Sequence, residues 1–351
     1  MLPHLSRAGA WFLNSGIQEP SGGVARYYRA DQGCNNPVST EITGYFASTL
    51  AWLHSLSGDE RYLEAAVAAA RFLVRLWNPN ERSMPFEVSP PAHTYFFDCG
   101  IILRGLIAVW RATQQDQFLA VAVGLGRAME RDFGAPDGSF EPVLSLPDRH
   151  PQAHDPLRWS QAPGCYQLKS ALGWLDVAEA TGDARFRAPY ERALEYSLRT
   201  YGGFLPGHPN EQKVMDRLHA YLYFLEGLLP RAGEKRGGAA VCDGIRRVAQ
   251  HLEEIAPEFA RSDVYAQLLR MRMYADAAGV TTLDRDAAAR EAAHLAAFQA
   301  ADGDARIDGS YWFGRRGRDV LPYANPVSTA FAAQALAMWE GVAPVDGRAV
   351  I

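Results

Sequence analysis

A repeated pattern of paired helices constrains the fold of this chain more than any single motif does. Apolar segments alternate with amphipathic segments, and a short turn joins the two members of each pair. The clearest turns are Ser57-Gly58-Asp59-Glu60-Arg61-Tyr62 and Thr181-Gly182-Asp183-Ala184-Arg185-Phe186, with weaker copies at 112–118, 232–234 and 278–280. Glycine ends one helix in the left-handed conformation, and the acidic residue favours the start of the next. The pattern predicts helical hairpins repeated along the whole chain.

The two helices of each pair differ in how much of their surface is apolar. The segment after the first turn carries a single apolar stripe, formed by Leu63, Val67, Ala70, Leu73 and Trp77. Such a stripe indicates an outer helix that is half exposed to solvent, whereas a segment that is apolar on every face is buried on every face. We therefore predict inner helices at about 40–56, 96–112, 164–180, 214–229, 262–278 and 326–341, and outer helices near 4–14, 60–77, 116–132, 184–200, 236–255 and 285–299.

This alternation predicts an all-α fold of the (α/α)6 toroid class, with residues 1–351 forming a single domain. Strand signals are weak, and 86–88 is the segment where a local pairing is expected. The long loops all lead from an outer helix to the next inner helix: 18–35, 78–94, 134–163, 201–212, 256–261 and 300–324. They should gather at one end of the ring, and binding residues usually lie on such loops.

The pentapeptide Asn-Pro-Val-Ser-Thr occurs twice, at 36–40 and at 325–329. Asparagine suits the N-cap of a helix, and proline suits the first helical position. Each copy precedes an apolar segment, so we predict that both begin inner helices and that the first and last repeats lie side by side. This would place Asn36 and Asn325 on the rim of a central cavity, as candidate substrate-binding residues. The alternative is that the pentapeptide is only a favourable helix start.

Composition narrows the classes of partner. The net charge is −5 and the estimated pI is 6.0, so no basic surface is indicated and nucleic acid is not expected as a partner. The first residues lack the pattern of a signal peptide, and no apolar run approaches the ~18 residues of a membrane span. Four widely spaced cysteines form no CxxC pair and indicate reduced thiols. We expect a cytoplasmic protein, and the oligomeric state stays open.

Charged residues at the predicted starts of inner helices are the candidates for chemistry. Glu41 and Asp263 have an ordinary explanation as well, because the helix dipole favours acids in the first turn. Asp98 is harder to explain in that way, because it lies between the aromatic run 95–97 and the apolar run 101–103. A buried carboxyl must be paired, protonated or in a wet cavity. Among aromatic residues its pKa would be raised, as a general acid requires.

A second group of charges lies at the predicted start of the helix at 214–229. Asp216 and His219 share one helix face, whereas Arg217 points elsewhere and suits an acid on a neighbouring helix. A structural ion pair between helices explains the group equally well. An Asp-x-x-His pair alone does not define a metal site, and the motifs GxSxG, GxGxxG and GxxxxGK[ST] are absent. We therefore predict neither a metal nor a cofactor.

Aromatic and basic residues in or beside the long loops suggest a sugar as the ligand. Aromatic faces stack on sugar rings, while arginines such as Arg26, Arg158 and Arg315 offer paired donors to a uronate, sulfate or phosphate group. For Trp312 the alternative role is to anchor its loop. The candidate substrate-binding residues are Tyr95, Tyr166, Lys169, Arg217, Arg261, Asp263, Trp312, Asn36 and Asn325.

The Gly-Asp-x-Arg-aromatic turns and the Asp-Gly-Ser-aromatic loops at 137–140 and 308–311 resemble those of the six-hairpin (α/α)6 carbohydrate enzymes. This superfamily includes unsaturated uronyl hydrolases, N-acylglucosamine 2-epimerases and several polysaccharide lyases. The resemblance covers the whole chain and concerns its architecture. Residues 95–100 look like the helix start on which the uronyl hydrolases carry a catalytic Asp, although Phe97 stands where His or Asp is often found. The paired catalytic histidines of the epimerases have no clear counterpart.

These observations favour a carbohydrate-active enzyme, specifically a glycoside hydrolase acting on an acidic or substituted saccharide. Asp98 would be its general acid, and Asp216 or Glu41 its general base. The first alternative is an epimerase or lyase whose base is His219, assisted by Tyr166 or Lys169. The second alternative is a non-catalytic glycan-binding protein of polysaccharide assembly.

Overall fold

The computed structural model describes residues 2–80 and 83–351, which form two compact units. The first-half unit comprises Gln18–Arg26 and Pro37–Thr200. The second-half unit comprises the start of the chain up to Ile17, together with Tyr27–Asn36 and Tyr201–Ile351. Each unit has its own inner and outer helices, and none of the described helices is long and apolar enough to cross a membrane.

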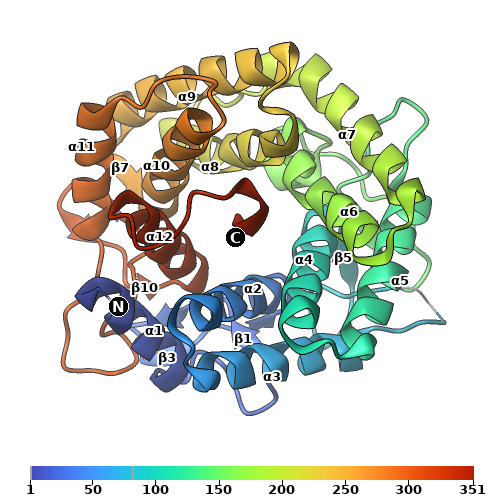
Figure 1. The fold of residues 1–351 in the computed structure, drawn as a ribbon, viewed down its shortest axis with the longest axis horizontal. Coiled ribbons are helices and arrows are strands. Elements are labelled where there is room, and N and C mark those ends of the chain that lie inside the picture. The colour runs from blue at the N-terminus through green and yellow to red at the C-terminus, as the bar shows by residue number, and fades with distance from the viewer. Residues whose placement is uncertain (1, 81–82) are drawn as a thin grey trace. The chain divides into compact units, whose positions relative to one another are not determined.

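The first-half unit has two layers of helices (Figure 1). Its inner helices α2, α4 and α6 pack side by side, and the outer helices α3, α5 and α7 pack against them. The bounds are α2 (Thr40–Ser57), α3 (Glu60–Leu76), α4 (Phe96–Thr113), α5 (Asp116–Phe133), α6 (Leu168–Thr181) and α7 (Arg187–Thr200), with short 3₁₀ helices at Trp159–Gln161, Cys165–Gln167 and Ala184–Phe186. The predicted helices of this half are thereby confirmed.

Glycines let the inner helices of this unit approach closely. A Cβ on Gly105 would lie 2.5 Å from the carbonyl oxygen of Gly44, and one on Gly100 would lie 2.5 Å from the Cα of Ser170. Neither position has room for a side chain, so the α2–α4 and α4–α6 contacts depend on glycine. These contacts fix the starts of the three helices relative to one another.

Short strands brace the helix starts of the first-half unit. β1 (Val24–Ala25) pairs antiparallel with β4 (Val38–Ser39), and β5 (His93–Tyr95) pairs antiparallel with β6 (Val143–Ser145). The segment 86–88, where at most a local pairing was expected, forms no strand, but Phe86 donates one backbone hydrogen bond to His93, where β5 begins. Ladders of two or three residues leave no periodic signal in a sequence.

The second-half unit repeats the layered arrangement. Inner helix α10 packs against α8 and α12, while α9, α11 and α1 cover them (Figure 1). The helix bounds are α1 (Pro3–Asn14), α8 (Glu211–Gly227), α9 (Lys235–Ile255), α10 (Ser262–Ala277), α11 (Arg285–Ala296) and α12 (Pro326–Trp339), with 3₁₀ helices at Tyr201–Gly203, Leu229–Arg231 and Gly347–Ala349. Two three-stranded sheets have the orders β10-β2-β3 and β7-β8-β9, formed by β2 (Tyr28–Arg29), β3 (Cys34–Asn35), β7 (Phe259–Arg261), β8 (Gly314–Arg316), β9 (Asp319–Val320) and β10 (Tyr323–Ala324).

The turns within the hairpins mostly follow the prediction. Gly58 and Gly182 adopt φ of 69° and 72° at helix ends, and Asp59 and Asp183 cap the following segments. In the weaker copy at 112–118, Gln114 takes the left-handed conformation without being glycine. The prediction was wrong at 232–234, because α8 ends in a 3₁₀ turn at Leu229–Arg231 and Gly233 has no positive φ.

The two copies of the pentapeptide adopt different structures. Asn325 caps α12, accepting hydrogen bonds from the backbone N–H groups of Val327 and Ser328 at 2.9 and 3.0 Å, as predicted. In the first copy Ser39 is the N-cap and α2 begins at Thr40, so the expectation that Asn36 caps this helix was wrong. The reason is that pairing with β1 holds Val38 and Ser39 in extended conformation. That the two copies form one patch stays a prediction.

Candidate functional site

Two carboxyl groups at the starts of neighbouring inner helices form the candidate site. Glu41 is the second residue of α2, and Asp98 is the third residue of α4. The Asp98 side chain is buried, with 7% of the residue exposed, whereas Glu41 is half-buried. Oδ2 of Asp98 has no hydrogen-bond partner within the described part of the chain. A buried, unpartnered carboxyl oxygen is rare in a folded protein and calls for a functional explanation.

Burial makes both of these carboxyl groups weak acids. Burial, and then the charge of Glu41, raise the pKa of Asp98 well above its usual value, although Arg26 opposes them. Burial likewise raises the pKa of Glu41 to about 7 against the opposing charge of Arg26. Asp98 therefore binds its proton more tightly than an ordinary carboxyl does, while Glu41 titrates near neutral pH. Two carboxyls with different proton affinities can serve as an acid and a base.

Hydrogen bonds from adjoining segments hold these helix starts in place. The Thr40 hydroxyl donates to the Pro85 carbonyl at 2.9 Å, which ties α2 to the loop before β5. The Ser170 hydroxyl of α6 donates to the Phe97 carbonyl at 2.8 Å, beside Asp98. The two carboxyl groups are thus carried by a braced scaffold.

Aromatic rings surround the acids. The ring of Phe97 lies 6.0 Å from that of Tyr166 and 6.4 Å from that of Trp159, centre to centre. Tyr95 is half-buried, and burial raises its pKa, so its phenol is neutral. The amine of buried Lys169 lies 6.0 Å from the centre of the Tyr45 ring. The first-half unit therefore brings together Glu41 and Asp98 with the predicted substrate-binding residues Tyr95, Tyr166 and Lys169.

Arg26 is a cation close enough to the two acids to lower the pKa of each. Its guanidinium carbon lies 4.3 Å from the centre of the Phe86 ring, and its backbone N–H donates to the Pro37 carbonyl at 3.3 Å. The guanidinium forms no hydrogen bond and no ion pair with the residues that the structure describes.

The second-half unit holds a contrasting cluster, in which Arg261 joins two acids. Its Nε and Nη2 donate to the two oxygens of Asp263 at 3.0 and 2.5 Å, and its Nη1 donates to Asp216 at 2.9 Å. Burial alone would raise the pKa of Asp263, but Arg261 and His219 outweigh it and hold the pKa below its usual value. Ser262, the first residue of α10, donates its hydroxyl to the Trp312 carbonyl at 2.7 Å.

His219 is buried and neutral. Its Nδ1 lies 2.7 Å from Oε1 of Gln267 and 3.5 Å from Asp263. An amide oxygen only accepts, so Nδ1 carries the hydrogen and Nε2 is left as an acceptor. Burial lowers the pKa of His219 to about 4. Asp216 turns instead to Arg261 and Lys213, so the two residues predicted to share a face have different partners.

The remaining predicted residues have structural partners. Arg217 donates to the Phe204 carbonyl at 3.0 Å, and its guanidinium carbon lies 4.3 Å from the centre of the Phe204 ring. The side-chain oxygen of Asn325 is used in capping α12, and the backbone of Asn36 donates to Tyr27. Trp312 is partly exposed, which leaves its face available for stacking.

Sequence reasoning missed two polar side chains beside the predicted residues. Gln267, fully buried in α10, orients His219, and its own Nε2 has no partner among the described residues. An amide inside an otherwise apolar stretch was the available signal. Glu87 lies close enough to raise the pKa of Asp98 and pairs with His93 at 3.4 Å, but nothing in its loop sequence indicated this.

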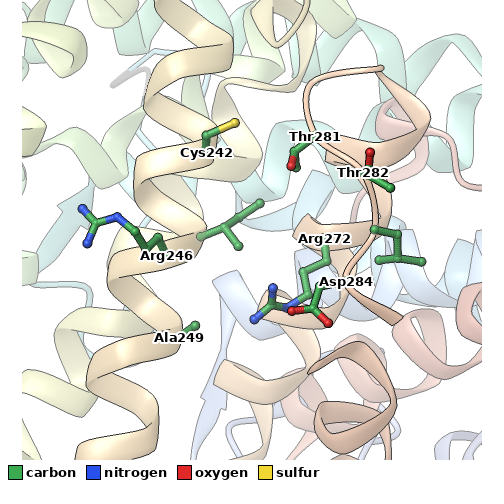
Figure 2. Close-up of a pocket in the computed structure, with 9 residues that line it drawn as sticks. Cys242, Arg246, Ala249, Arg272, Thr281, Thr282 and Asp284 are labelled. Carbon is green, nitrogen blue, oxygen red and sulfur yellow. The ribbon is translucent and has the colours of Figure 1, made fainter. Parts of the chain in front are cut away.

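A separate pocket of about 310 Å³ lies between α9 and the segment that follows α10 (Figure 2). Its charged groups already have protein partners. Arg246 pairs with Asp243 at 2.6 Å, Arg272 pairs with Glu291 at 2.8 Å, and Asp284 caps α11. No group of three or more His, Cys, Asp or Glu side chains in residues 2–80 and 83–351 is arranged to hold a metal ion. The acid pair of the first-half unit is thus the candidate that calls for a ligand.

Comparison with solved structures identifies the fold class. No protein-family model matches the chain, and no curated protein matches it in sequence. Solved structures do match over nearly the whole chain. A sugar epimerase from a ruminal bacterium has a TM-score of 0.73 at 10% identity, covering 97% of this chain and 98% of its own.

Two further structures agree with this result. Cellobiose 2-epimerase from Spirochaeta thermophila has a TM-score of 0.72 at 14% identity, covering 95% of each chain. The unsaturated glucuronyl hydrolase of Bacillus sp. GL1 has a TM-score of 0.69 at 15% identity, covering 97% of each. The fold is that of the six-hairpin (α/α)6 class. The predicted fold class and the architectural resemblance are confirmed, and the structural neighbours are carbohydrate-active enzymes.

Proposed function

We propose that this chain is a carbohydrate-active enzyme, namely a glycoside hydrolase in which Asp98 is the general acid and Glu41 the general base. The observation that carries the proposal is the buried Asp98 carboxyl, whose Oδ2 has no partner among the described residues and whose pKa is raised. Glycoside hydrolysis needs a protonated carboxyl for the leaving oxygen and an ionised one for the attacking water or sugar carbon. The sugar enzymes that share this fold support the proposal.

The environments of the two carboxyls assign their roles. Asp98 is the more deeply buried and keeps its proton, so it can protonate the departing glycosidic oxygen. Glu41 has a pKa of about 7, so a large fraction is ionised at neutral pH and can take a proton from water. Asp216 is less suited to be the base, because Arg261 and Lys213 already hold its charge. Tyr95 and Trp159, both partly exposed, offer faces for a sugar ring.

The test is turnover by Asp98→Asn on a panel of unsaturated glucuronyl disaccharides, cello-oligosaccharides and aryl glycosides. We expect kcat to fall by about 10²- to 10⁴-fold, the usual contribution of a general acid. Asp148→Asn makes the same chemical change at an exposed loop position and should leave kcat unaltered. Saccharide binding without turnover by the wild type, persisting in Asp98→Asn, would identify a glycan-binding protein instead.

A second candidate function is sugar epimerisation or isomerisation, with His219 as the base. The observation that favours it is the neutral imidazole, whose Nε2 is left as an acceptor by the bond from Nδ1 to Gln267. A base of this kind would remove a proton beside a carbonyl carbon. Turnover of a saturated cello-oligosaccharide in D₂O separates the two functions, because epimerisation places deuterium on a sugar carbon and hydrolysis of a saturated glycosidic bond does not. Loss of that exchange in His219→Asn, with Asp98→Asn still active, would replace the hydrolase proposal.

A further inference from the structure

The strongest unexplained feature of the first-half unit is a cation among carboxyl groups that it does not bind. The guanidinium of Arg26 lies over the Phe86 ring, and no described side chain accepts a hydrogen bond from it. Arginine in such a stacked position presents several N–H donors in a fixed plane, which suits an oxyanion with two or more oxygens.

The backbone around Arg26 fixes it beside Glu41. β1 ends at Ala25 and pairs with β4, which ends at Ser39, the N-cap of α2. The N–H of Val24 also donates to the Thr43 hydroxyl at 3.0 Å, inside the first turns of α2. Arg26 therefore follows directly from a strand that is tied to the helix carrying Glu41.

We infer that Arg26 is the anchor for an anionic group, a carboxylate or sulfate carried by the saccharide, and that occupying it drives a proton onto the Glu41–Asp98 pair. The inference rests on the proposed function and deepens it. It names the charge of the substrate, and it explains how substrate binding keeps the general acid protonated. The test below measures binding and protonation without turnover. The inference can therefore fail while the proposed hydrolysis is correct, and the hydrolysis can fail while the inference is correct.

The coupling follows from charge alone. Arg26 lowers the pKa of both Glu41 and Asp98, and a bound anion would cancel that effect. The carboxyl pair then takes up a proton near neutral pH. Binding and protonation are reciprocal, so the anion must bind more tightly as the pH falls.

Other titratable and charged groups surround this cluster on every element that packs against it. Glu87 is engaged with His93, while Tyr95 and Tyr166 are neutral because burial raises their pKa. The remaining groups on the described elements are Tyr45 of α2, Lys169 of α6, Cys99 of α4, Cys165 before α6 and Arg158 of the 134–163 loop.

Sulfate is a suitable probe because it stays fully ionised at neutral pH, so any proton taken up goes to the protein.

The experiment is a ¹³C NMR titration of the side-chain carboxyl of Glu41 in the full chain, in sodium sulfate and in sodium chloride at equal ionic strength. Glu41→Gln assigns the resonance. We expect the titration midpoint to be higher in sulfate than in chloride, and sulfate affinity to weaken by up to about tenfold per pH unit between those two midpoints. Equal midpoints in the two salts would overturn the inference.

Two arginine variants complete the test. Arg26→Met keeps an apolar contact with Phe86 and should abolish the effect of sulfate. Arg199→Met removes the same charge from an exposed arginine of the same unit, stacked on Tyr196, and should behave as wild type. An undiminished effect of sulfate in Arg26→Met, shown to be folded by circular dichroism, would also overturn the inference.

Discussion

Asp98 and Asp263 occupy matching places in the two units, and their pKa values are shifted in opposite directions. Each lies in the first turn of an inner helix, α4 or α10, with only 7% or 2% of the residue exposed. Asp263 meets Arg261 and His219, which keep it ionised. Burial and then the like charge of Glu41 raise the pKa of Asp98 well above its usual value.

The difference arises at the residue that precedes each helix. Arg261 is the N-cap residue of α10 and folds back onto Asp263, whereas Tyr95 occupies the N-cap of α4 and offers Asp98 no charge. Burying a carboxylate that is not hydrogen-bonded to a cation costs several kcal/mol, so the pKa of such an acid rises. Helix position and burial therefore do not decide the charge of a buried acid. A cation that forms hydrogen bonds with the acid decides it.

The largest effect should come from removing the cation of Asp263. Arg261→Met leaves a buried carboxylate uncompensated, and breaking such a pair costs about 3–5 kcal/mol. Urea denaturation at pH 7 measures the free energy of unfolding. Arg185→Met breaks the same two-bond pair with Asp183 at the exposed surface and should change nothing measurable. Equal losses in the two variants would break the comparison.

A smaller effect separates the two acids themselves. Asp263→Asn removes charge-assisted bonds to Arg261 and should lower the free energy of unfolding by about 1.5–3 kcal/mol. Asp98→Asn replaces a neutral carboxyl with a neutral amide of the same shape and should change that free energy by less than about 1 kcal/mol. The same urea titrations measure both, and similar losses would mean that Asp98 is ionised in the folded protein.

The smallest effect is on how the free energy of unfolding depends on pH. Glu41 and Asp263 change this free energy in opposite directions as the pH rises. Because the folded pKa of Glu41 is about 7 and its ordinary value is 4.5, the folded chain binds more protons between those pH values. Stability from this group is complete below about pH 4.5 and is lost as the pH rises through 7. Asp263 has a lowered pKa, so its contribution is lost instead as the pH falls below its usual value of 3.8.

Glu41→Gln sharpens this result. Denaturation midpoints measured from pH 2 to pH 8 should fall less steeply in the variant than in the wild type across the upper part of the range. The acid limb, which reflects Asp263, should be the same in both. If the stability of the wild type and of Glu41→Gln changed equally with pH between pH 5 and 7, that result would contradict the assigned pKa of Glu41.

The sequence predicted the helices well, because the Gly-Asp turns at Gly58 and Gly182 mark their ends and amphipathic stripes mark the outer members. It singled out Asp98 because a carboxyl between aromatic and aliphatic runs has no ordinary cap role. It could not distinguish Asp98 from Asp263, since the second partner of Asp263 is His219, which lies 3.5 Å away in space and on another helix.

Short ladders and long-range contacts were out of reach in the same way. Nothing periodic marks β1 and β4, so the first pentapeptide was assigned the helix start that only the second one forms. Arg26 was recognised as a donor for anions, but its place on Phe86 depends on two loops that meet only in the fold. Contacts of this kind depend on tertiary packing, and no local pattern encodes them.

The account depends most on the proton that Asp98 holds at neutral pH, and infrared spectroscopy observes that proton directly. Difference spectra at pH 7 compare the wild type with Asp98→Asn and with Asp263→Asn. The account predicts that Asp98→Asn removes a protonated-carboxyl band and that Asp263→Asn removes a carboxylate band. Loss of a carboxylate band in both variants would show that Asp98 is ionised, and it could not then be the general acid.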